Sequence, residues 1–215
     1  YLEKPGLERL ADVFPVTNLE FLEQAYHKGR GVILLTYHSP VNRLAVLALS
    51  QRLKGETIPA ISEKQARLES GHWQENYARD LPDRELAALK AGIALEGQHL
   101  LEQGRIVQFV SDNEYAQQGH PVVIAKRRYY LRPGFAELAL NTGAVIVPQF
   151  NCMHLDGRIH MTILPPFIIP EGNREKQTAQ LLNLYAAFIN DAWRKAPESI
   201  RWPRVMRHFD QPLAS

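Results

Sequence analysis

A short apolar run, with glycines before it and a Ser-Pro pair after it, limits the possible folds more than any other part of the sequence. Positions 32–35 read Val-Ile-Leu-Leu and follow directly after glycines at positions 29 and 31. A run that is apolar at every position is typical of a strand buried on both faces, as in a parallel sheet. Ser39-Pro40 follows shortly after, and this pair is typical of a helix start, because serine caps a helix and proline fits its first turn. The segment therefore predicts a buried strand followed by a helix.

The rest of the chain continues this alternation. Further strands are predicted over 106–110 and 145–147, and helices over 18–24, 41–49, 85–103, 135–141 and 176–195. Such alternation is typical of an α/β fold. The length of 215 residues suits a single domain, 1–215, with its own core. Because the chain begins at Tyr1 rather than Met, we expect a domain trimmed or excised from a longer protein.

A β-hairpin is predicted around the Asp-Gly pair at 156–157. A three-residue loop, 156–158, keeps one face of the hairpin apolar by placing Met153 opposite Met161. The same register places His154 opposite His160. Because no third ligand accompanies this pair, we interpret both as surface histidines and expect no metal site.

Composition and charge exclude several classes of protein. The 25 Lys and Arg against 23 Asp and Glu leave a net charge of +2, which is too small to indicate nucleic-acid binding. Basic residues nevertheless gather at 126–132 and 194–207, where they suit phosphate headgroups, anionic lipid or an acidic carrier protein. No apolar run approaches the ~18–20 residues of a membrane-spanning helix. The single Cys152 excludes an intramolecular disulfide and fits a reducing compartment.

His38 is the strongest candidate for chemistry. The sequence motifs of dinucleotide binding, nucleotide hydrolysis, zinc proteolysis and α/β-hydrolases are absent. His38 comes just after the predicted 32–35 strand, and in open α/β sheets the sites gather at the carboxyl ends of strands. An imidazole in this place can act as a general base. The alternative is a histidine that only hydrogen-bonds within its turn.

Several short blocks occur in the order that one known family shows. They are Leu19-Glu20-x-Leu22, Gly29 to His38, Leu101-x-x-Gly104-Arg105-x-Val107, Asp112-Asn113, Arg132 to Pro148, Leu164-Pro165-Pro166, and Ala196-Pro197-Glu198 with Trp202. Together these blocks resemble the bacterial lipid A biosynthesis acyltransferases, the lauroyl and myristoyl transferases of the lysophospholipid acyltransferase superfamily. The resemblance extends over about 19–202 of the chain.

The resemblance implies an αβα sandwich with a mostly parallel central sheet. It also implies transfer of a fatty acyl group from an acyl thioester, carried by acyl carrier protein or coenzyme A, to a lipid or glycolipid hydroxyl. The thioester is a co-substrate, and no further cofactor is implied. The implied location is the cytoplasm, peripheral on the inner face of the cytoplasmic membrane. In the family's H-x4-D/E motif the histidine is the general base, and His38 matches it.

The sequence departs from the family at the acidic position of this motif, which is occupied by Arg43. Asn42, one place earlier, can accept a hydrogen bond from the ring after a local shift of one residue, as Asn does in papain-like proteases. Another carboxylate can also supply the charge, and Glu63, Asp112 and Glu114 are the candidates. Of these, Asp112 follows a strand end, where the family also has Asp, and we expect it to order the site. The remaining alternatives are an amine acceptor, a different histidine arrangement, or an inactive module that binds lipid or acyl chains.

Substrate-binding residues are expected around the start of the 135–141 helix. Arg132 and Gly134 lie there, and backbone N–H groups at a helix N-terminus suit a phosphate or a transition-state oxyanion. Lys126, Arg128 and Arg43 complete the expected set as cations for the anionic parts of the substrates.

Overall fold

The computed structural model describes residues 14–42, 45, 48–49, 52–53, 57–59, 93–112, 119–154 and 157–201. These residues form a six-stranded sheet, in the order β1-β8-β7-β2-β4-β3, and a separate two-stranded hairpin, β5-β6. Every neighbouring pair in the larger sheet is parallel except β7 with β8. The predicted α/β class with a mostly parallel sheet is therefore confirmed.

The elements follow one another along the chain with these bounds. They are β1 (Val16–Thr17), α2 (Leu19–Tyr26), β2 (Val32–Thr36), β3 (Thr57–Pro59), α6 (Ile93–Glu102), β4 (Ile106–Val110), β5 (His120–Ile124), β6 (Arg127–Leu131), α7 (Gly134–Thr142), β7 (Val145–Met153), β8 (Ile159–Ile163), α8 (Arg174–Lys195) and the 3-10 helix η4 (Pro197–Ser199).

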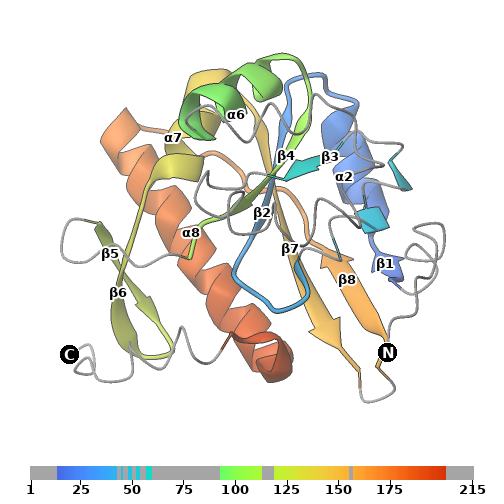
Figure 1. Cartoon of the computed structure of the whole chain (residues 1–215). Coiled ribbons are helices and arrows are strands. Elements are labelled where there is room, and N and C mark those ends of the chain that lie inside the picture. The colour runs from blue at the N-terminus through green and yellow to red at the C-terminus, as the bar shows by residue number, and fades with distance from the viewer. Residues whose placement is uncertain are drawn as a thin grey trace, which may run out of the picture.

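Helices cover both faces of the large sheet, with α7 and α8 on one side and α2 on the other (Figure 1). Strand β2 shows why the 32–35 run is apolar throughout. Ile33 and Leu35 pack in the core that includes α7 and α8, whereas Val32 and Leu34 pack in the core that includes α2. Because both faces of β2 are covered, each of these side chains is fully buried.

The β5-β6 hairpin is a part of the fold that the sequence patterns did not predict. It lies beside α8, apart from the six-stranded sheet (Figure 1). Val122 and Tyr129 are buried in the same core as residues of α8, and the Asn190 side chain accepts a hydrogen bond from the backbone N–H of Ala125 at 2.7 Å. The basic residues of 126–128 lie in the β5-β6 turn and in the first two residues of β6. Strand β3 was not predicted either.

The predicted register of the 151–164 hairpin is wrong by two residues. Met153 pairs with Ile159 rather than Met161, and His160 pairs with Cys152 rather than His154. A slip of two residues keeps every side chain on its expected face, because side chains alternate with a period of two. The apolar pattern therefore predicted which side chains share a face of the hairpin, but it did not determine the length of the loop.

Gly31 lets β2 start close against the end of α6, and its replacement tests this contact. A Cβ at Gly31 would lie 2.8 Å from Leu101 Cα, in a residue whose φ is +71°. We expect Gly31→Ala to lower the free energy of unfolding by about 3 kcal/mol or more, from strain plus a backbone clash. Gly29 is the matched control, because its φ is +66° but no atom of the other described residues, its chain neighbours aside, lies within 4 Å of the added Cβ. Gly29→Ala should cost only about 1–2 kcal/mol. Chemical denaturation measures both, and equal losses would contradict the clash.

Within the described part of the chain, no helix combines the length and the apolar character needed to cross a membrane.

Candidate active site

The candidate site lies where two central parallel strands end side by side. Thr36, the last residue of β2, is the register partner of Val110, the last residue of β4. His38 and Asp112 therefore each lie two residues beyond the end of their strand, at the same edge of the sheet. Carboxyl edges of this kind are where open α/β sheets form their sites.

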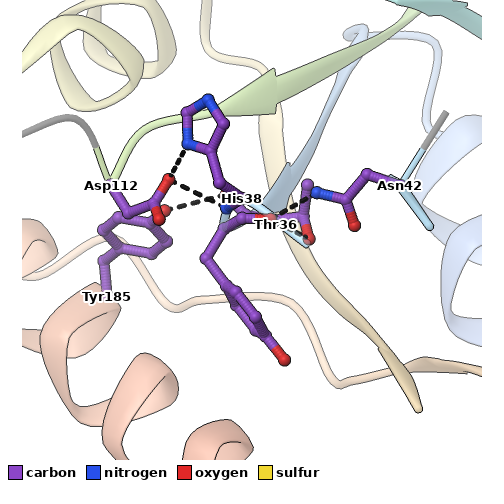
Figure 2. Close-up of polar contacts among 6 residues, drawn as sticks. Thr36, His38, Asn42, Asp112 and Tyr185 are labelled. Carbon is purple, nitrogen blue, oxygen red and sulfur yellow. Dashed lines mark hydrogen bonds and ion pairs between the residues drawn. The ribbon is translucent and has the colours of Figure 1, made fainter. Parts of the chain in front are cut away.

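His38 and Asp112 are joined by two hydrogen bonds (Figure 2). The Oδ1 atom of Asp112 bonds to His38 Nδ1 and also accepts from the backbone N–H of His38 at 2.9 Å. Because an ionised carboxylate only accepts, Nδ1 of the ring carries a proton, and in a neutral imidazole the lone pair is then on Nε2. The two side chains are only 16% and 9% exposed. Among the described residues, Nε2 has no hydrogen-bond partner.

Two buried tyrosines hold the strand end that carries His38. The Tyr185 hydroxyl of α8 donates to the Thr36 carbonyl at 2.8 Å. The Tyr37 hydroxyl lies 2.6 Å from Ser199 Oγ, which itself donates to the Ala196 carbonyl. Burial raises the pKa of Tyr37 to about 12 and that of Tyr185 well above its usual range. Both hydroxyls therefore remain protonated and can donate.

The raised pKa of Tyr37 predicts a loss of stability in alkali. Its usual value is 10.0 and its folded value about 12, so the folded state holds this proton more tightly than the unfolded state. The contribution of Tyr37 is fully present below pH 10 and is lost as the pH rises through about 12. We expect this loss to reach about 2–3 kcal/mol. Tyr37→Phe should be less stable at neutral pH and should lack this part of the alkaline decline. Free energies of unfolding from pH 8 to 12 measure it, and parallel curves for the two proteins would contradict it.

Asn42 was one of the alternatives for the partner of the His38 ring, and it bonds elsewhere. Its Nδ2 donates to the Tyr37 carbonyl and its Oδ1 accepts from Asn151 Nδ2 at 2.8 Å. Figure 2 places Asn42 on the opposite side of His38 from Asp112. The ring partner of His38 in the structure is Asp112.

The expected substrate-binding residues that the structure describes lie in the β5-β6 hairpin, in the segment after it and at the start of α7. Lys126 is in the β5-β6 turn and Arg128 in β6, and both are exposed. Arg132 is exposed in the segment between β6 and α7, and Gly134 is the first residue of α7. Arg43, like Glu63 and Glu114, lies outside the described residues.

The β7-β8 hairpin carries the other candidate groups. The rings of His154 and His160 have centroids 4.2 Å apart, and Cys152 Sγ lies 3.5 Å from His154 Nε2. In the described segments, no group of three or more His, Cys, Asp or Glu residues is placed to hold a metal ion. Burial, with a smaller effect from Glu198, raises the pKa of the Cys152 thiol. This favours the protonated thiol, which is a poor nucleophile.

An imidazole bonded through Nδ1 to a part-buried carboxylate, at the carboxyl edge of a mostly parallel α/β sheet, is an arrangement suited to general-base catalysis. The comparison with family models gives this site its class. The model of the bacterial lipid A biosynthesis acyltransferases matches residues 2–202, so the chain belongs to that family and is an acyltransferase of the lipid A type. None of the curated proteins compared with the chain matches it.

Proposed function

We propose that this protein transfers a fatty acyl group from an acyl thioester to a hydroxyl group of a lipid or glycolipid, with His38 as the general base. The thioester is carried by acyl carrier protein or coenzyme A. The observation that carries the proposal is the His38–Asp112 pair, because it leaves Nε2 of a neutral imidazole free to take a proton. Family membership supports the reaction type.

The proposed reaction needs no covalent enzyme intermediate. His38 Nε2 takes the proton of the acceptor hydroxyl as its oxygen attacks the thioester carbonyl. The tetrahedral intermediate then breaks its C–S bond, and the imidazolium returns the proton to the departing thiolate. An ester and a free thiol result. The Asp112 carboxylate fixes the ring and stabilises the positive charge that His38 carries between the two transfers.

The remaining site residues are assigned to binding. Lys126, Arg128 and Arg132 are exposed cations, and we assign them, with Arg43, to the anionic groups of the substrates. Gly134 opens α7, so its backbone N–H is suited to a phosphate or an oxyanion. Because the proposed acceptor is a lipid, we place the protein on the inner face of the cytoplasmic membrane as a peripheral protein.

An inactive lipid-binding module is the competing function, and its main support was Arg43 in place of the family's acid. The Asp112 contact weakens that support, because it supplies a carboxylate from the segment after β4. The deciding experiment gives the full chain a labelled acyl group on acyl carrier protein or on coenzyme A, with vesicles that contain glycolipid acceptors. We expect labelled acylated lipid. Saturable vesicle binding with no turnover from any donor would instead support the binding module.

A further inference from the structure

Two buried carboxamides connect the His38 segment to strand β7. Asn42 Nδ2 donates to the Tyr37 carbonyl, and Asn151 Nδ2 donates to Asn42 Oδ1 at 2.8 Å. Asn42 is 7% exposed and Asn151 is fully buried. The directions of these bonds follow from the chain of partners. A carbonyl only accepts, so Asn42 must turn its amide group to Tyr37 and its oxygen to Asn151.

These two hydrogen bonds lead from β7 to the peptide group between Tyr37 and His38. The carbonyl of Tyr37 and the backbone N–H of His38 belong to one peptide, and each is held from a different side. Asn42 holds the carbonyl, and Asp112 Oδ1 accepts from the N–H at 2.9 Å (Figure 2). A rotation of this peptide would displace its N–H from Asp112 Oδ1. The His38 ring would be displaced as well, because it bonds to that same Oδ1 atom.

We infer that Asn151 is a positioning residue for the proton transfer proposed above, acting through Asn42 on the Tyr37–His38 peptide. The inference rests on the proposed function. It also assigns a positioning role to the segment after His38, which contains Asn42. In this protein that segment contributes the amide of Asn42, while the acid comes from the segment after β4. A displacement of about 1 Å at a reacting group can cost roughly 10²-fold in rate, so an anchor of this kind matters to catalysis.

The chain contains a close control for Asn151. Gln149 lies on the same face of β7, two residues earlier, and is also fully buried. Its amide nitrogen and oxygen have no hydrogen-bond partner in the described structure. Replacing Gln149 therefore changes a buried amide on the same strand face without removing a bond to the His38 segment.

The test compares Asn151→Leu with Gln149→Met in the full chain. We measure kcat and KM in the thioester assay, the unfolding midpoint, and the NMR signal of the His38 ring proton on Nδ1, assigned by its loss in His38→Ala. We expect Asn151→Leu to lower kcat roughly 10–100-fold with KM within about twofold, and to shift or broaden the ring-proton signal. Gln149→Met should keep the wild-type kcat and the wild-type ring-proton signal. If Asn151→Leu fails to fold, the smaller Asn151→Ser takes its place, because its hydroxyl is too short to replace the amide.

A double-variant cycle separates positioning from a general structural role. If both asparagines act through one bond, Asn42→Ala with Asn151→Leu should lose no more kcat than Asn42→Ala alone, within about twofold. Independent, multiplying losses would overturn the inference, as would an unchanged kcat and ring-proton signal in Asn151→Leu. If the wild-type protein shows no acyl transfer, the proposed function fails, but the ring-proton signal still tests whether Asn151 positions His38.

Discussion

Replacing His38 with alanine is expected to lower kcat for acyl transfer roughly 10²–10⁴-fold, the usual contribution of a positioned general base. The reason is the free Nε2 lone pair, which the bond from Nδ1 to Asp112 leaves as the proton acceptor of the ring. Without it, the acceptor hydroxyl must lose its proton to water as it attacks. KM should change little if His38 acts mainly in the transition state. Initial rates with labelled acyl thioester and a lipid acceptor, at several concentrations of each, give both constants.

His99→Ala is the matched control for this experiment. His99 is exposed on α6 and bonds only to Gln103, at 2.8 Å, among the described contacts. We expect it to retain wild-type kcat and KM. Turnover that survives in His38→Ala would remove the proposed mechanism, whereas equal losses in both variants would indicate damage to the fold.

The sequence patterns predicted best where burial alone decides the structure. Strand β2 is buried on both faces, so its apolar run identified it, and β4 was predicted with its observed bounds. The β5-β6 hairpin was missed because its alternation is irregular and its turn is Ala125-Lys126. Both turn residues have positive φ, at 49° and 61°, where Gly, Asn or Asp is the usual signal.

The partner of His38 could not be found from spacing along the chain. The family motif places the acid five residues after the histidine, and that position holds Arg43. Asp112 is 74 residues away in sequence but neighbours His38 in the sheet, because β2 and β4 pair in register to their last residues. A signal did exist, since each residue comes two places after a predicted strand. Asp112 was therefore among the candidate carboxylates, but choosing it over Glu63 and Glu114 required knowing that these two strands are neighbours, which the sequence alone did not establish.

Replacing Asp112 with asparagine should also reduce kcat strongly, and the size of the loss tests where the acid function lies. An amide oxygen can still accept from the backbone N–H and from Nδ1 of His38, so the variant should keep its fold and the ring orientation. It lacks the negative charge that stabilises the imidazolium during the reaction. Loss of this charge in a serine-protease triad costs ~10⁴-fold, and we expect roughly 10²–10⁴-fold here. The measurement is kcat with saturating thioester and acceptor.

Asp191→Asn provides a carboxylate control, because Asp191 lies on the surface of α8 and pairs with Lys195 at 2.6 Å and Arg194 at 2.7 Å. Its loss should leave kcat unchanged. Near-normal turnover in Asp112→Asn would mean that the charge comes from elsewhere, and then Glu63 and Glu114 become the residues to replace. A loss as large as that of His38→Ala would instead show that the two residues act as one unit, since effects within such a unit do not add. The family's H-x4-D/E spacing would then be one way to place a carboxylate beside the histidine. In this protein the carboxylate comes instead from the segment after β4.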